Sequence, residues 1–97
     1  MNSQERERRK IRELAREYTQ KGYVVRKAPL PAQLPKSLQA YRPDLWLTKG
    51  EQHIWVEVKT SETIEQSPYL VAIAELLKEL PNWELELVLT NPKKKKA

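Results

Sequence analysis

With 97 residues, the chain has room for one small domain with one core, and it is too short for separate catalytic and recognition domains. Its content of 39% hydrophobic and 32% charged residues is typical of a globular protein, and the absence of cysteine excludes disulfides, thiolate nucleophiles and cysteine-ligated zinc. No apolar run approaches the roughly 18 to 20 residues of a membrane span, and the N-terminus lacks the apolar stretch of a signal peptide, so we expect a cytoplasmic protein without a membrane partner.

The net charge of +5 is unevenly distributed along the chain. Residues 1–27 carry +5, residues 28–90 carry −4, and four lysines at 93–96 add +4. Two basic ends around an acidic middle suit a polyanionic partner that is held at the periphery, with a metal-binding acidic site at the centre. The alternative is a solvated helix face and a frayed basic tail, which require no partner.

The first predicted element is a helix that begins at a cap on Asn2 or Ser3 and runs to about Lys21, where Gly22 ends it. Apolar residues recur at helical spacing along one face of this segment. They are Ile11, Leu14, Ala15 and Tyr18.

One acid of this helix differs from the others in its position. Glu7 lies one turn before Ile11 on the inward face, whereas Glu13 and Glu17 point away from it. We therefore expect Glu7 to approach the rest of the fold, with Glu13 as the alternative if the alignment of the helix shifts.

The β-branched run Tyr23 to Arg26 predicts the first strand. The following segment, 28–43, contains four prolines, which forbid a central strand and disfavour a continuous helix. Loops of this length are uncommon in compact domains and are often functional. The alternative is an extended connector with one helical turn at Lys36–Ala40, which covers the core with Leu30, Leu34 and Leu38.

Residues 44–48 and 53–59 predict the second and third strands, and Ser67 followed by Pro68 is typical of the capped start of a second helix over residues 68–80. This helix is apolar over more than one narrow face, so we expect it to be largely buried on a sheet. Residues 83–90 alternate as a final half-buried strand does. The fold class is therefore α/β. We expect an antiparallel meander of three strands and a crossover helix that lays the fourth strand parallel to the third.

We expect a single domain over residues 1–91, followed by a basic, mobile tail over residues 92–97.

Turn chemistry predicts the register of the hairpin. A two-residue type II′ turn with Gly50 in its first central position pairs Lys49 with Gln52 and places Asp44 opposite Glu57. One face of the hairpin is then apolar core, formed by Leu45, Leu47, Ile54, Val56 and Val58. The other face carries Asp44, Trp46, Trp55, Glu57 and Lys59.

Two opposed carboxylates in this register have β-carbons about 4.5 to 5.5 Å apart, and their charges repel by roughly 3 kcal/mol at an effective dielectric constant of about 20. A shared proton, a nearby cation or a divalent metal must offset this repulsion. Two carboxylates and a lysine are also the groups needed to hydrolyse a phosphodiester. The carboxylates hold Mg²⁺, and Lys59 orients or deprotonates the attacking water and offsets the charge of the transition state.

These residues resemble a known superfamily. Arg42-Pro43-Asp44 at a strand start, with Glu57 and Lys59 in the later stretch VEVK, looks like the PD-(D/E)xK nucleases of restriction-endonuclease-like fold. The leading segment ERERRKIRELAREYTQKGYVVRKAP is similar to the archaeal Holliday-junction-resolvase branch.

The resemblance covers about residues 5–90 and implies a core of helix, three strands, helix and strand, with a small mixed four-stranded sheet flanked by helices. It implies Asp44 and Glu57 as metal ligands, Lys59 as the catalytic lysine and Glu7 as the acid of the first helix. It also implies DNA cleavage that depends on Mg²⁺ or Mn²⁺, without a small-molecule cofactor, and a homodimer, because resolvase-like proteins often cut two strands as dimers.

A rival hypothesis is a catalytically silent nuclease-fold module that binds nucleic acid or a partner protein in a larger assembly. We expect His53, the only histidine, to be an ordinary surface or cross-strand residue. Trp46 and Trp55 form a cross-strand pair. We expect both rings to pack under the first helix, and the alternative is a platform on which bases stack. Thr60 and Ser61 are expected either to contact a phosphate or to form a cap or turn.

Overall fold

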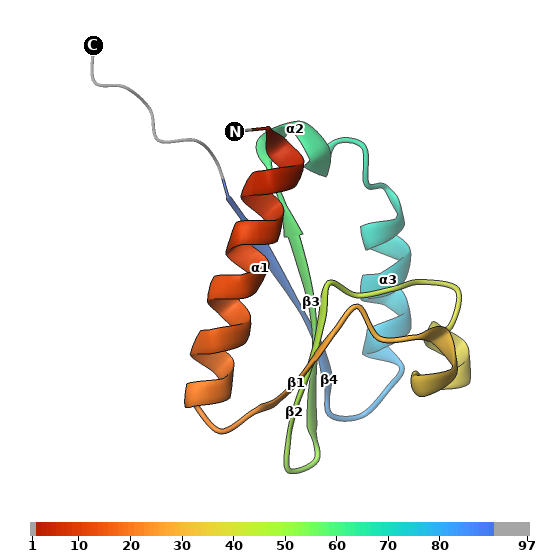
Figure 1. Ribbon diagram of the computed structural model, residues 1–97. Helices are drawn as coiled ribbons and strands as arrows, with labels where there is room; N and C mark the ends of the chain where they lie inside the picture. Colours follow the sequence, from red (N-terminus) through yellow and green to blue (C-terminus); the bar gives the residue numbers. More distant parts are fainter. Residues whose placement is uncertain (1, 91–97) are drawn as a thin grey trace.

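A computed structural model describes residues 2–90 of the chain. Figure 1 shows three layers: one long helix, a sheet, and a third layer made of a shorter helix and a long loop. The elements in chain order are α1 (Ser3–Gln20), β1 (Val24–Lys27), the 3₁₀ turns η1 (Pro31–Gln33) and η2 (Lys36–Leu38), β2 (Leu45–Lys49), β3 (Gln52–Lys59), α2 (Ser61–Ile64), α3 (Tyr69–Lys78) and β4 (Trp83–Leu89). The predicted α/β order of helix, three strands, helix and strand is confirmed, with the short α2 as an addition.

The sheet has the predicted topology. Its strand order is β1-β2-β3-β4, with antiparallel pairing up to β3 and parallel pairing between β3 and β4. The hairpin register is also confirmed, because Lys49 pairs with Gln52 and Leu45 with Val56. Gly50 has φ +59°, the left-handed conformation that the first central position of a type II′ turn requires.

The first core lies between α1 and the sheet. α1 begins at Asn2, whose side chain accepts a hydrogen bond from the backbone of Glu5, as predicted for its cap. The buried members of this core are Leu14, Ala15, Leu45, Leu47, Ile54, Val56 and Val58. The apolar face predicted for the hairpin is therefore the face that α1 covers.

The second core lies on the opposite face of the sheet, and it corrects the expectation for the two tryptophans. Trp46 and Trp55 pack with α3 and with the loop before β2, not under α1. The reason is the alternation of the strands: both rings share a face with Glu57, and α1 covers the other face. Trp55 is fully buried, so it offers no base-stacking platform.

The long loop, residues 28–43, is a partly helical cover for this second core. Leu34 and Leu38 are buried as expected, but Leu30 is 62% exposed and the expectation that it covers the core is wrong. Leu30 lies in extended backbone just before the turn η1. The ends of the loop are joined, because the guanidinium of Arg42 donates two hydrogen bonds to the carbonyl of Ala28, at 3.1 and 2.7 Å.

Two expectations for the second predicted helix are also corrected. Ser67 does not cap α3: its hydroxyl donates to the carbonyl of Thr63 at 2.9 Å, because the chain makes the extra helix α2 just before it. The helix is buried on one face only, and Val71 is 70% exposed because it points away from the sheet.

Across residues 2–90, no helix is long and apolar enough to cross a membrane. The predicted basic tail over residues 92–97 lies outside the described residues.

Candidate active site

The candidate site lies where the start of β2 meets the end of β3. Continuing the observed register by one pair places Asp44 opposite Glu57, as predicted. The backbone N–H of Asp44 donates to the carbonyl of Val56 at 3.0 Å, and its carboxylate accepts from the N–H of Val58 at 2.8 Å. These contacts fix the aspartate against the neighbouring strand.

Glu57 is the most enclosed ionisable group of this site, with an exposed fraction of 2%. One carboxylate oxygen accepts from the indole N–H of Trp55 at 3.1 Å, and the other accepts from the hydroxyl of Tyr69 at 3.4 Å. Burial, followed by the negative charge of Asp44, raises the pKa of Glu57 to about 7, against the opposing effects of Lys59 and Trp55. The metal-free carboxyl is therefore partly protonated at neutral pH.

The pKa of Asp44 is raised for similar reasons. Burial raises it, the hydrogen bond from Val58 and the charge of Lys59 lower it, and the charge of Glu7 raises it further. Glu7 therefore acts electrostatically on Asp44, and three acids gather their negative charge at one end of the sheet. Such a cluster favours a cation.

Lys59 supplies one positive charge to this cluster. Its ammonium lies 3.8 Å from a carboxylate oxygen of Glu57 and 5.2 Å from the ring centre of Tyr69. Burial lowers the pKa of Lys59, but its contact with Tyr69 and the charges of Glu57 and Asp44 outweigh this effect and raise the pKa above its usual value. The side chain is thus a cation at neutral pH, suited to a negatively charged ligand.

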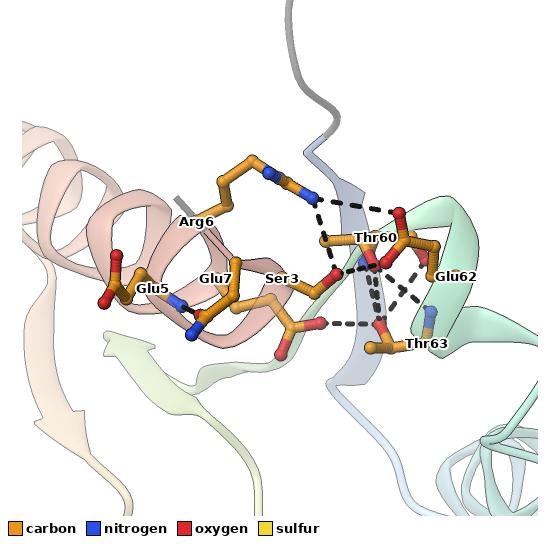
Figure 2. A network of polar contacts seen from close by, with 8 residues as sticks. Ser3, Glu5, Arg6, Glu7, Thr60, Glu62 and Thr63 are labelled. Atoms are coloured by element: carbon orange, nitrogen blue, oxygen red, sulfur yellow. Dashed lines mark hydrogen bonds and ion pairs between the residues drawn. The ribbon is translucent and has the colours of Figure 1, made fainter.

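Glu7 reaches the site from α1, as predicted from its inward position. Its carboxylate accepts from the hydroxyl of Thr63 in α2 at 2.6 Å (Figure 2). Glu13 is exposed and pairs with Lys10 at 3.6 Å, so the structure does not bring it to the site. The sequence identified the correct face of α1, and the structure identifies the partner on that face.

The start of α1 and the whole of α2 are joined by a polar network (Figure 2). Ser3 donates to Glu62 at 2.6 Å, and Arg6 lies 3.9 Å from the same carboxylate. Thr60 and Thr63 form a capping box at the start of α2, so capping is the role that the structure shows for Thr60. Because α2 directly follows Lys59, this network fixes the position of Glu7 relative to the end of β3.

The donor set fits a hard divalent ion. No group of three or more His, Cys, Asp or Glu side chains within residues 2–90 forms a ready metal cage. Mg²⁺, however, usually keeps several waters and is held by one or two carboxylates together with substrate phosphates. The mutually repelling pair of buried Glu57 and half-buried Asp44 matches that donor set.

Two residues of the site were not predicted as such. Tyr69 was expected only as part of the second helix, and no sequence signal relates it to Glu57. Trp55 was expected as half of an aromatic pair, although its position two residues before Glu57 on the same strand face is a signal for this contact. Both residues donate to the Glu57 carboxylate.

His53 lies at the opposite end of β3 and takes no part in the site. It accepts from the indole N–H of Trp46 at 3.2 Å and stacks on Trp83 with ring centres 4.4 Å apart. The expectation of an ordinary cross-strand residue is confirmed.

Comparison with known proteins gives one result. A family model described as AHJR-like, of restriction-endonuclease type (REase_AHJR-like), matches residues 1–97. No curated protein and no solved structure matches the chain.

Proposed function

The chain belongs to the AHJR-like family of restriction-endonuclease-like nucleases, and on this premise we propose that it is a metal-dependent endonuclease that hydrolyses DNA phosphodiester bonds. The observation that carries the proposal is the convergence of Asp44, Glu57 and Lys59 at one end of the sheet. Branched DNA, such as a four-way junction, is the substrate we propose, because the leading segment is similar to resolvases. We also propose that the protein acts in the cytoplasm.

We propose that Asp44 and Glu57 hold Mg²⁺, or Mn²⁺ in its place. When bound, this ion supplies Lewis-acid polarisation of the phosphate. The raised pKa of Glu57 reflects an environment that is unfavourable for its charge without a cation. Glu7 faces the same cluster from α1 and adds negative potential there.

The remaining roles belong to side chains around the two carboxylates. Lys59 offsets the negative charge that builds up on the phosphate in the transition state, as a positioned cation does. Trp55 and Tyr69 orient the carboxylate of Glu57 by donating to its two oxygens. Thr63 holds Glu7 toward the site.

Cleavage assays test the proposal. Purified protein is incubated with linear, nicked, flap and four-way DNA, each with EDTA, Mg²⁺ or Mn²⁺. We expect metal-dependent nicking that falls by at least 100-fold in Lys59→Ala and persists in Lys78→Ala, whose ammonium is exposed and pairs with Glu75. Equal activity of Lys59→Ala and wild type would contradict the proposed mechanism.

A homodimer is part of the proposal, because two copies carry two sites and can cut both strands of a junction. Paired, symmetric incisions in the four-way substrate and a dimer mass in solution are the expected results. Single nicks from a monomer would contradict it.

A catalytically silent module that binds nucleic acid or a partner protein is the second candidate. One observation favours it: the carboxylates of Asp44 and Glu7 already accept protein hydrogen bonds, from Val58 and Thr63. Metal titration separates the two, because the enzyme binds Mn²⁺ at a site that Asp44→Asn abolishes, whereas the silent module binds none.

A further inference from the structure

One flank of α1 carries a row of arginines. Arg8, Arg12 and Arg16 are four residues apart, so they lie above one another on the helix, with a rise of about 6 Å per step. All three are exposed, and none forms an ion pair within residues 2–90. The spacing of these unpaired cations is similar to the separation of successive phosphates along a nucleic-acid strand.

The row borders a hollow between α1 and the edge strand β1. This hollow has a volume of about 570 Å³, and its charged lining consists of Arg12, Arg16 and Lys27, without an acid. A second hollow of about 390 Å³ shares Arg12 and is lined by Arg8, Arg9 and Glu5. We call Arg8, Arg12, Arg16 and Lys27 the arginine row. Arg12 belongs to both hollows and so links them, and Glu5 is the one acid in their lining.

The opposite flank of α1 has a different charge. There Lys10 pairs with Glu13, and Tyr18 donates to Glu86 of β4. Glu17 is exposed nearby on the helix. Cations and acids are thus paired on this flank, whereas the three arginines on the β1 side form no ion pair within residues 2–90.

The row begins beside the candidate active site. Arg8 follows Glu7, whose carboxylate contacts α2, and Figure 1 shows the start of α1 next to α2. From Arg8 to Arg16 the row extends about 12 Å along α1, away from the site. A nucleic acid seated at the active site can thus continue along the row.

We propose that the arginine row binds the sugar-phosphate backbone of a DNA duplex arm that leaves the active site toward β1. This inference rests on the proposed nuclease function and deepens it. It assigns the direction in which the substrate extends and implies contact without sequence preference, since cations at this spacing read phosphates rather than base edges.

The test compares two double variants of equal charge. Arg12→Gln/Arg16→Gln removes two members of the row, and Lys10→Gln/Lys78→Gln removes two cations that pair with neighbouring acids. Glutamine keeps helix propensity close to that of both residues. Affinity for a duplex of about 30 base pairs is measured in EDTA from low to moderate salt, so that cleavage plays no part.

We expect the row variant to weaken binding by about tenfold and to lower the slope of log K against log salt by about two, one for each lost phosphate contact. The control variant should keep the slope of wild type. In the metal-loaded enzyme, the row variant should raise KM for the long duplex and leave kcat unchanged, since it touches no group at the site.

Equal losses in the two variants would overturn the inference, because binding would then follow net charge alone. No loss in either variant would overturn it too, because the row would then contribute nothing to binding. If wild type cleaves and binds DNA while the row variant behaves identically, only the inference fails. If wild type binds no DNA even at low salt, the proposed function fails as well. Thermal unfolding at the wild-type temperature confirms that the row variant is folded.

Discussion

Two conditions oppose the ionisation of Glu57: its side chain is 2% exposed, and Asp44 faces it across the hairpin. The positive charge of Lys59 only partly offsets these two effects. The pKa of Glu57, about 7 in the fold, exceeds the ordinary value of 4.5. The folded, metal-free protein therefore binds more protons than the unfolded chain between these two values, and its stability falls as pH rises through this window.

We predict that the unfolding free energy of the metal-free protein falls between pH 5 and pH 8 by up to about 3 kcal/mol. Glu57→Gln should remove most of this fall, because it has no proton to lose. Chemical denaturation in EDTA at several pH values measures the unfolding free energy of both proteins. The matched control, Glu51→Gln, alters an exposed turn residue and should keep the slope of wild type. A flat profile in wild type would contradict the prediction.

Tyr69 is the one residue that contacts both Glu57 and Lys59 from α3. We predict that Tyr69→Phe lowers kcat by about threefold to tenfold, because a hydrogen bond of 0.5 to 1.5 kcal/mol is lost while the ring remains. The pH profile of kcat should shift too, since the lost donor stabilises the charged form of Glu57. Tyr41→Phe is the control, because Tyr41 stacks on Tyr69 at 6.5 Å without contacting Glu57. Equal effects of the two variants would assign Tyr69 a packing role only.

At the scale of elements, the short helix α2 connects the end of β3 to α1. Thr63 accepts from the backbone N–H of Thr60 and donates to Glu7, so one hydroxyl serves both the cap and the acid. We predict that Thr63→Val destabilises the protein by about 1 kcal/mol, which lowers Tm by roughly 4 to 8 °C in a domain of this size.

Thr63→Ser keeps the hydroxyl and should retain most of the stability. Calorimetry of the two variants measures the difference. A cleavage assay adds a second readout: if Glu7 contributes to the site, the valine variant loses activity beyond its loss of folded protein. Indistinguishable Tm values for valine and serine would contradict the role of the hydroxyl.

The long loop begins with a strained residue. Ala28 has φ +40°, in the left-handed region that side chains with a β-carbon avoid. We predict that Ala28→Gly is stabilising by about 0.5 kcal/mol, because relief of strain exceeds the added entropy of the unfolded chain. Denaturant titration checks this, with Ala32→Gly in η1 as the control that should destabilise. Loss of stability in Ala28→Gly would mean that the strain is absent.

The elements that could be predicted from the sequence are those with local signals. The cap at Asn2, the alternation in β3 and the glycine turn at Gly50 each depend on nearby residues, and the opposition of Asp44 and Glu57 followed from them. Which face of the sheet each helix covers depends on the handedness of the connections between strands, and this is not a local signal. The tryptophans were therefore placed under the wrong helix, and the contact from Tyr69 to Glu57 was missed.

At the scale of the whole molecule, the acidic and the basic groups are concentrated in different parts of the fold. The acidic cluster lies at the end of β3, and the arginine row lies on the side of α1 that borders β1. The arginine row attracts a polyanion directly, whereas the acidic cluster needs a bound cation before it can accept the same polyanion. In the metal-free molecule, the charge of Glu57 is therefore unfavourable at the place where the protein is proposed to react.

This arrangement predicts that divalent metal stabilises the fold in a pH-dependent manner. Mn²⁺ or Mg²⁺ at about 100 times its Kd should add about 3 kcal/mol, which corresponds to a rise in Tm of roughly 10 °C or more. The rise should be larger at pH 8 than at pH 5.5, because protons compete for Glu57 below its pKa of about 7. Asp44→Asn should abolish the rise, and Glu51→Gln should keep it. An equal rise in wild type and Asp44→Asn would place the ion elsewhere, and no rise in wild type at millimolar metal would favour the silent module over the enzyme.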